Sequence, residues 1–580
     1  MSALDARSLV QRGWDHLRAQ RPLAAWASWQ RAIRLNPGDE AATKALELLA
    51  GSSELPAAAR AEYRFQTPDD PRHRERWNRR LQGQGLDELD AARAAFADLA
   101  DDDPIDHVAR LNLALCLAWL GRNREAVATL EQAVRLLATT DFDQASQCWT
   151  LAEVLRHGGG AEAIADDLRH VWVVDPPASS ALTEGVIRRW PNLREVAVPR
   201  DPISGGPALS DGRVFEWLDR PGIDPSAGAP ARPEGLPRVL ATVIVAPGSF
   251  RLSTPDPAGL AALDDPPLAE VAAILLEGRR EATPLPLAWS DAAIGTFRFP
   301  EGVDESIKRT LARSAVEHYY ENLWIHQPRH GLDGRTPLDA STGDAADLAK
   351  LAGVVRFREQ LGQRSTHAAL YQGYPFDRLR RRLGLIGPAD SAVLDAADVT
   401  CMSGRELDAL DGSELAGPRL VDAVASAQGL RDDSRVFRLA RAWLRGRPEG
   451  FEGLDAGAVI ASLVRHALRE GSHGDALAIL TQARELARDD PHSQRTFMVW
   501  TAEILARAGR SAESLEIYRE ILANVGGSAG ARLAFDGAET LLDLGHDDQA
   551  VPLLQVAREM ALAAEDSFLL SRAETLLSRP

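Results

Sequence analysis

The sequence predicts a mainly α-helical protein in which two solenoid arrays of helical hairpins flank a small α+β module. One observation is a repeat with a period of 34 residues, in which Ala92 and Phe96 recur as Ala126 and Leu130. Another is a looser repeat near the C-terminus, where Gly509 and similar glycines mark successive hairpin turns. Between the two arrays the helical period disappears and β-rich runs occur. A fixed period of this length is typical of stacked helical hairpins.

Composition narrows the classes of function. The net charge of −18 disfavours nonspecific binding to nucleic acid and to anionic membranes. Only Lys44, Lys308 and Lys350 among the 66 basic residues are lysines, which indicates a GC-rich coding bias and a bacterial origin. No apolar run reaches the roughly 18 residues of a membrane span, and Asp5 and Arg7 stand where a signal peptide needs apolar residues. We therefore expect a cytoplasmic protein.

The N-terminal array is assigned to residues 1–180. Small residues, a bulky aromatic and a closing proline stand at regular offsets in its first hairpin, at Gly13, Ala25, Trp29, Ala32 and Pro37. The small residues allow two antiparallel helices to approach closely, the aromatic fills the gap to the next hairpin, and the proline ends the second helix. This pattern resembles the tetratricopeptide repeat of bacterial repeat proteins. The resemblance implies a helical scaffold that binds other proteins.

The repeat pattern resumes after a connector at residues 55–72. Residues 141–177 are interpreted as a degenerate further hairpin, with three glycines at its turn. A phosphate-binding loop is disfavoured there, because no strand precedes the glycines and no Lys-Ser/Thr pair follows them. The positions that carry the repeat in the second and third hairpins are Asp87, Ala92, Phe96, Gly121, Ala126 and Ala133.

The middle of the chain is predicted to have a different architecture. Residues 181–237 are rich in Pro, Gly, Ser and Asp and are assigned to an extended linker that contains a short helix at 214–218. The α+β module follows at 238–386 and begins with a β-hairpin, because two β-rich runs are separated by Pro247 and Gly248. Its further predicted elements are a helix at 268–278, a strand at 294–299 and a long helix that starts near Asp304.

The most distinctive local string follows that long helix. A glycine there permits a tight turn, and a threonine can cap a short helix whose first residue is a proline. The string is similar to the tryptophan-then-LxGxTPxxA pattern in the toxin-binding domain of Xre/MbcA/ParS-type antitoxins, over residues 316–357. The resemblance implies a partner-binding role for its tryptophan, leucine and threonine. The motif positions are Trp324, Leu332, Gly334, Thr336, Pro337 and Ala340.

The module is predicted to end in a basic helix that begins near Asp377. Such a helix would carry Leu379 and Leu383 inward and its arginines outward. We interpret these arginines as a solvated face, with contact to nucleic acid or an acidic partner as the alternative. They are Arg378, Arg380, Arg381 and Arg382.

Residues 387–580 are assigned to a second, looser array. The glycines at its hairpin turns are 38 and 36 residues apart, so longer loops must absorb the difference from 34. A last helix at 565–580 is predicted to cap the array. The turn glycines are Gly471, Gly509 and Gly545, and the last hairpin continues with Ala550, Leu554 and Ala557.

Motifs of catalysis or cofactor binding are absent from the sequence: there is no GxxxxGK[ST], GxSxG or HExxH. His326 and His330 are four residues apart, but Pro328 interrupts a shared helix and no third metal ligand is indicated. We predict no enzyme activity, no metal and no cofactor. The cysteines Cys116, Cys148 and Cys401 form no CxxC pair, and we expect them to be buried hydrophobic residues.

These observations favour a non-enzymatic scaffold or adaptor that binds proteins or peptides in the grooves of its repeats. Arg76, Arg80, Arg110 and Asn112 are the candidate groove residues of the N-terminal array, because they are polar positions on first helices and could hold an acidic or C-terminal peptide end. One alternative is a regulatory protein that binds a toxin-like partner through the central module. A less favoured alternative is an enzyme with a site in that module.

Overall fold

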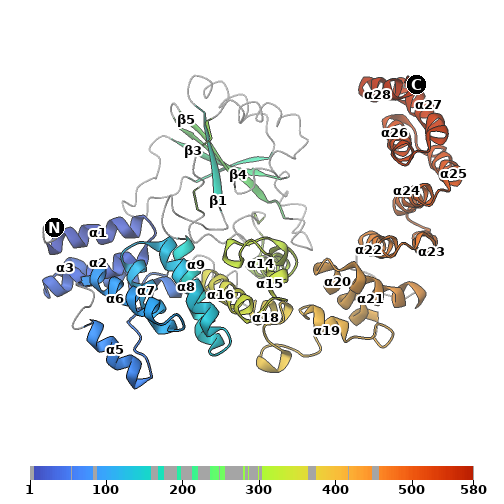
Figure 1. Cartoon of the computed structure of the whole chain (residues 1–580). Coiled ribbons are helices and arrows are strands. Elements are labelled where there is room, and N and C mark those ends of the chain that lie inside the picture. Colours follow the sequence, from blue (N-terminus) through green and yellow to red (C-terminus); the bar gives the residue numbers. More distant parts are fainter. Residues whose placement is uncertain are drawn as a thin grey trace. The chain divides into compact units, whose positions relative to one another are not determined.

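Two compact units divide the chain, Met1–Val393 and Leu394–Pro580, which we call unit 1 and unit 2. Both units consist mainly of helices, and unit 1 also contains a small antiparallel sheet, as the predicted fold class requires (Figure 1). The computed structural model describes residues 5–53, 55–81, 88–157, 168–174, 192–197, 212–219, 236–246, 249–254, 279–280, 285–286, 298–299, 303–363, 374–415, 417–446 and 456–578.

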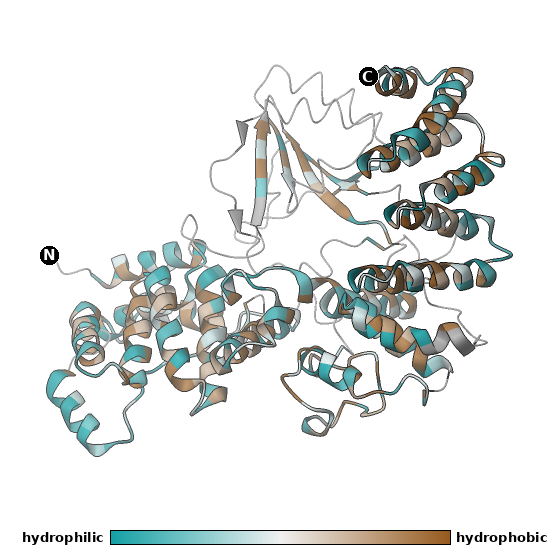
Figure 2. Cartoon of the chain, turned by 45° about the vertical axis from the view of Figure 1, so that its right-hand side comes forward, coloured by the Kyte–Doolittle hydropathy of each residue, from teal (hydrophilic) through white to brown (hydrophobic). Residues whose placement is uncertain are grey.

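Unit 1 starts with stacked helical hairpins, such as α1 with α2 and α7 with α8. Apolar residues lie between the helices and hydrophilic residues cover their outer faces (Figure 2). The helices are α1 (Ala6–Arg18), α2 (Pro22–Leu35), α3 (Glu40–Ala50), α4 (Ala57–Arg60), α5 (Pro71–Leu81), α6 (Leu89–Asp102), α7 (His107–Trp119), α8 (Asn123–Leu137) and α9 (Phe142–His157).

The predicted repeat positions have the packing roles that the pattern requires. A Cβ atom on Gly13 would lie 2.2 Å from the indole nitrogen of Trp29, so only glycine allows α1 and α2 to approach this closely. Gly121 has a φ of 78°, and the next amide donates back to the carbonyl of Leu117, which ends α7 in a left-handed turn. Pro37 follows the end of α2, and Asp87 lies outside the described residues. The fully buried repeat residues are Ala25, Trp29, Ala32, Ala92, Phe96, Ala126 and Ala133.

The hairpin predicted at 141–177 is wrong in its second half. Its first half forms α9, but residues 168–174 form a strand, because the run HVWVV consists of aromatic and β-branched residues. The helix that packs along α9 is instead α16 (Ala345–Gly362). Gly353 permits this contact, since its Cβ would lie 2.7 Å from the carbonyl oxygen of Ser146. The three predicted turn glycines of this hairpin lie outside the described residues.

The antiparallel sheet has the strand order β2-β3-β4-β5-β1-β6, and β7 also pairs with β1. The predicted β-hairpin is confirmed as β4 and β5, which are paired from Thr242 and Ser253 to Ala246 and Ser249. The strands are β1 (Leu168–Val174), β2 (Leu193–Val196), β3 (Arg213–Leu218), β4 (Val239–Ala246), β5 (Ser249–Thr254), β6 (Arg279–Arg280) and β7 (Leu285–Pro286).

Part of the predicted linker therefore belongs to the sheet. The short helix predicted at 214–218 is wrong, because this segment is β3 and its bulky residues are buried: Phe215 pairs with Val243, and Trp217 with Ala241. The helix predicted at 268–278 lies outside the described residues. Of the strand predicted at 294–299, only residues 298–299 are described, and they are not in a strand.

The chain is helical again after the sheet. The predicted start of a long helix near Asp304 is confirmed, since the Asp304 side chain caps α14. Leu311 and Ala315 of this helix pack against Leu236 and Phe299. The elements are α14 (Glu305–His318), the π-helix η5 (Tyr319–Leu323), the 3-10 helices η6 (Trp324–His326), η7 (His330–Leu332) and η8 (Pro388–Asp390), α15 (Pro337–Ala340), α16, and α18 (Asp377–Arg382).

The prediction of a solvated arginine face on α18 is wrong. Arg381 and Arg382 are 0% and 1% exposed, and Arg378 is also buried. Arg378 forms ion pairs with Glu321 at 2.9 Å and with Glu317 at 2.8 Å. Arg380 is paired with Glu359 and Asp377. Acidic side chains of α14, η5 and α16 thus compensate the positive charges of Arg378 and Arg380, which were predicted to face solvent.

Unit 2 is a stack of hairpins, as predicted for the second array. Gly471, Gly509 and Gly545 have φ angles of 74°, 76° and 75° and form the turns between paired helices. Ala550, Leu554 and Ala557 are buried. The helices are α19 (Gly404–Asp408), α20 (Gly417–Gly429), α21 (Asp433–Gly446), α22 (Ala456–Arg469), α23 (His473–Leu486), α24 (Pro491–Arg507), α25 (Ser511–Leu522), α26 (Gly527–Asp543), α27 (Asp547–Ala563) and α28 (Ser567–Leu577).

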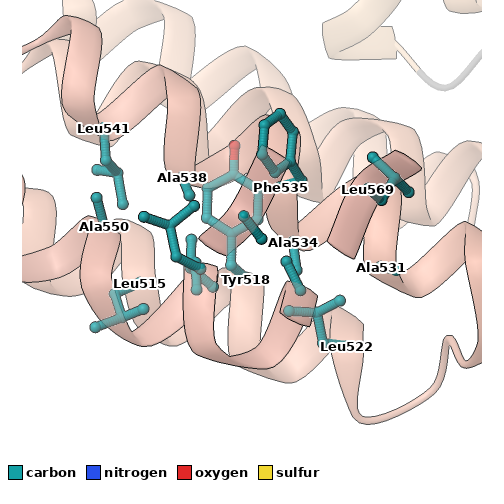
Figure 3. Close-up of a cluster of buried hydrophobic side chains, with 14 of the residues drawn as sticks. Leu515, Tyr518, Leu522, Ala531, Ala534, Phe535, Ala538, Leu541, Ala550 and Leu569 are labelled. Carbon is teal, nitrogen blue, oxygen red and sulfur yellow. The ribbon is translucent and has the colours of Figure 1, made fainter. Parts of the chain in front are cut away.

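The last hairpins of unit 2 share one hydrophobic core (Figure 3). Tyr518 of α25 lies in this core among Phe535, Ala538 and other residues of α26. A Cβ atom on Gly537 would lie 2.8 Å from the Tyr518 ring, so glycine is again the residue that permits close contact between helices. The three cysteines of the chain, one of which is Cys401, are buried, as predicted.

Candidate protein-binding surfaces

Two of the predicted groove arginines lie on α5 and are paired with acidic residues of α6. Arg76 Nη2 lies 3.2 Å from the carboxylate of Asp102. Arg80 reaches Asp98 at 2.9 Å and Asp102 at 3.2 Å. These pairs are partly exposed, so each stabilises the hairpin by no more than about 1 kcal/mol. Any acidic partner has to compete with the aspartates for these guanidinium groups.

Arg110 and Asn112, the other two predicted groove residues, lie on α7 and bind the backbone of their own chain. Arg110 donates to the carbonyl of Pro104 at 2.9 Å and to the Gln132 side chain at 3.0 Å. Asn112 is fully buried. Its Oδ1 accepts a hydrogen bond from the Gln66 amide at 2.9 Å, and its Nδ2 donates to the Gln66 carbonyl at 2.8 Å. A side-chain amide that pairs with both backbone groups of one residue is a binding element for extended chain.

The backbone that Asn112 binds belongs to residues 56–68, which we call the docked segment; it begins with α4 and continues from residue 61 without helix or strand. Tyr63 and Phe65 are half-buried, whereas Glu62 and Arg64 are exposed. This alternation is that of an extended chain that lies with one side against a surface. Desolvation raises the pKa of the Tyr63 hydroxyl above its ordinary value.

Aromatic and amide contacts hold the docked segment on α6, α7 and α9. The ring centroid of Phe65 lies 4.9 Å from that of Phe96 and 5.1 Å from that of Trp119. Gln144 on α9 donates to the side-chain oxygen of Gln66 at 2.8 Å. The helix α7 begins a hairpin and α9 packs with α16 in the next layer, and we call the surface that α7 and α9 form the N-terminal first-helix face. The protein's own chain occupies this face.

Residues 324–340 contain the motif that was predicted to bind a partner, and we call them the central element. The residues predicted to bind that partner make contacts within unit 1. Trp324 and Leu332 are 0% exposed. Thr336 accepts a hydrogen bond from the Asp339 amide at 3.1 Å and caps α15, as its position before Pro337 predicts. Gly334 has a φ of 78°, and Ala340 is fully buried.

The central element is attached to the N-terminal array. The indole N–H of Trp149 on α9 donates to the carbonyl of Gly331 at 2.9 Å. Lys350 on α16 is 2% exposed, and its Nζ lies 2.7 Å from Asp333 and 2.8 Å from Glu131 of α8. The same ammonium lies 4.8 Å from the centre of the Trp149 ring. The element thus docks α16 against α8 and α9.

Unit 2 has a pocket of about 240 Å³ between α22 and α24, which are the first helices of two successive hairpins. Val464 and Ile504 are buried in its lining, and Trp500 is half-buried there. Two further hollows in this unit lie between α21 and α23 and beside residues 409–413. The lining of the α22–α24 pocket consists of Ala461, Val464, Arg465, Leu468, Trp500, Glu503, Ile504 and Arg507.

Charged side chains surround the apolar part of the α22–α24 pocket. Arg465 lies 3.1 Å from the carboxylate of Asp433. Desolvation raises the pKa of Glu503, and the positive charge of Arg507 opposes this shift. An apolar lining with one aromatic and two guanidinium groups suits an apolar side chain that is followed or preceded by an acidic group.

Trp500, Arg465 and Arg507 were not predicted from the sequence. The signal available was their place on first helices, at positions that the repeat pattern does not specify. Among the described residues no group of three or more His, Cys, Asp or Glu side chains is arranged to hold a metal ion. No described helix is both long enough and apolar enough to span a membrane.

Comparison with known families shows tetratricopeptide repeats in both units. Residues 84–146 and 462–529 match the model of this repeat. The first stretch includes α7, to which the docked segment is bound, and the second includes Trp500 and Ile504 of the α22–α24 pocket. Nothing in this comparison supports the resemblance of the central element to antitoxin domains. A comparison with curated proteins gives no match.

Proposed function

We propose that the protein is a non-enzymatic scaffold that binds other proteins through its tetratricopeptide repeats, and that the α22–α24 pocket is a site of contact. The observation that carries the proposal is the position of this pocket between the first helices of two successive hairpins. The concave surfaces of stacked repeats are formed in this way and are used for binding. Trp500 provides a large aromatic surface of the kind that dominates binding energy at protein interfaces.

The partner expected at this pocket presents an apolar side chain beside a carboxylate. The apolar side chain would be covered by Val464, Trp500 and Ile504, which removes apolar surface from water. The carboxylate would lie near Arg507 and would compete with Asp433 for Arg465.

The alternative of toxin-like partner binding through the central element has less support. Trp324 and Leu332 are inside unit 1, and Thr336 caps a helix, so their contacts within the chain account for these residues.

Substitution of Trp500 tests the proposed function. Phe568→Ala is the matched control, because Phe568 is an aromatic residue of unit 2 that is 67% exposed and lies outside the pocket. Wild type, Trp500→Ala and Phe568→Ala are used for affinity purification from the native host with quantitative mass spectrometry. We expect the partners recovered with wild type and with Phe568→Ala to decrease about tenfold with Trp500→Ala. Equal recovery with all three proteins would contradict the proposal.

A further inference from the structure

The docked segment has the features of a bound peptide. Phe65 contacts the helices, the Tyr63 hydroxyl donates to the Ala58 carbonyl at 2.9 Å within the segment, and Glu62 and Arg64 are exposed. Its beginning is also held, because the Ala58 amide donates to the Gln360 side chain of α16 at 2.9 Å. The segment thus lies across several helices of the array, with α4 near α16 and its extended part on α6, α7 and α9, where an extended ligand of a repeat protein would lie.

Recognition of this segment has one component that does not depend on its sequence. Asn112 uses both ends of its amide to pair with the amide and carbonyl of Gln66, and every residue except proline offers these two groups. Asn112 is fully buried under the segment, so a chain that replaced the segment would have to supply the same two hydrogen bonds.

A second component depends on side chains. The ring of Phe65 contacts the rings of Phe96 and Trp119. The side-chain amide of Gln66 pairs with Gln144. Tyr63 lies two residues before Phe65 on the same side of the chain. The face therefore selects an extended sequence with two aromatics separated by one residue and followed directly by an amide side chain.

We propose that the N-terminal first-helix face is a second protein-binding site, for an extended peptide with this aromatic-x-aromatic-amide pattern, and that residues 56–68 occupy it as an intramolecular ligand. A partner peptide must displace this segment. Because the segment is covalently attached, its effective concentration is on the order of millimolar, and a free peptide binds with an affinity reduced in proportion. This proposal is independent of the α22–α24 pocket.

A labelled synthetic peptide with the sequence of residues 55–70 is the probe, and fluorescence anisotropy with the full-length protein is the measurement. Gln66→Pro removes the amide hydrogen that Asn112 accepts, at an exposed position of the segment. We expect this variant to bind the probe at least about tenfold more tightly than wild type, because the competing segment is weakened. Arg64→Ala is the matched control, since its side chain is exposed, and should behave as wild type.

Two further variants identify the site. Asn112→Ala combined with Gln66→Pro should abolish the gain in affinity, whereas Trp500→Ala combined with Gln66→Pro should retain it. Equal binding of the probe by wild type and Gln66→Pro, with thermal melting that shows both folded, would overturn the proposal. So would a gain that persists without Asn112.

Hydrogen exchange on the wild-type protein tests the proposal without a substitution. A peptide of residues 55–70 is added in excess. It is isotopically labelled, so that its mass differs from that of the chain's own segment. We expect exchange of the chain's amides at 63–67 to accelerate as the peptide displaces them. Unchanged exchange at millimolar peptide would show that the segment is a fixed part of the fold and would overturn the proposal.

Discussion

At the scale of single residues, the stability of unit 1 depends on a buried ion pair. Arg378 pairs with Glu321, which is 4% exposed, through two hydrogen bonds of 2.9 Å and 3.0 Å. Burial raises the pKa of Glu321, and the guanidinium group opposes that shift. The sequence did not reveal this pairing, because the two residues are far apart in the chain and arginines on a short helix are usually solvated.

Removal of the guanidinium group tests the role of this pair. We expect Arg378→Ala to lower the free energy of unfolding of unit 1 by about 3–5 kcal/mol, because it leaves the buried Glu321 carboxylate without its ion-pair partner and two hydrogen bonds. The double variant Arg378→Met with Glu321→Met should recover most of the loss, since neither member of this buried pair remains charged. Urea unfolding followed by circular dichroism measures both. A loss in the single variant as small as that of an exposed ion pair would contradict the assignment.

His16 makes the stability of unit 1 depend on pH. Desolvation, followed by the charges of Arg12 and Arg21, lowers the pKa of His16 from 6.5 to about 4, although Asp15 acts in the opposite direction. The folded protein thus favours the neutral ring. This contribution to stability is complete above pH 6.5 and is lost as the pH falls toward 4.

The expected pH dependence is measured as a difference between two proteins. The free energy of unfolding of wild type minus that of His16→Gln should be constant above about pH 7 and should decrease between pH 6.5 and pH 4. A difference that is independent of pH, or one that increases on acidification, would show that the imidazole is not held neutral.

At the scale of elements, the pairing of α9 with α16 is the main departure from the sequence prediction. Period and small-residue spacing predict hairpins whose two helices are adjacent in sequence, and α1 with α2 or α7 with α8 follow this rule. The pattern contains no information about a helix that returns after a sheet has been inserted. The β-rich run of β1, with its alternating valines, was the available sign that the hairpin does not continue.

Glycine substitutions test the contact between these two helices. A methyl group on Gly353 would meet the backbone of α9, with Ser146 oxygen at 2.7 Å and Thr150 nitrogen at 3.0 Å, so Gly353→Ala should destabilise unit 1 by about 1–3 kcal/mol. In the control Gly474→Ala, no atom lies within 4 Å of the new methyl group, and the change should stabilise α23 by up to about 1 kcal/mol. Thermal unfolding measures both, and similar effects of the two substitutions would contradict the close packing of α9 and α16.

At the scale of the whole molecule, tetratricopeptide repeats occur in both units, and their first-helix surfaces differ in occupancy. In unit 1 the docked segment lies on α7 and α9, whereas in unit 2 a pocket is present between α22 and α24. The repeat period was sufficient to predict the two arrays. It did not predict that the docked segment covers the N-terminal first-helix face. Residues 55–72 have no repeat period, and their side chains are adapted to the surface on which they lie.

Photo-crosslinking from inside the pocket tests the proposed scaffold function most directly. A benzoylphenylalanine replaces Trp500 in the full-length protein, and in a matched protein it replaces the exposed Phe568. Both proteins are illuminated in the native host. The proposed function predicts protein adducts from position 500 that are absent from position 568. Adducts from position 568 alone, or no adducts from either position, would contradict it.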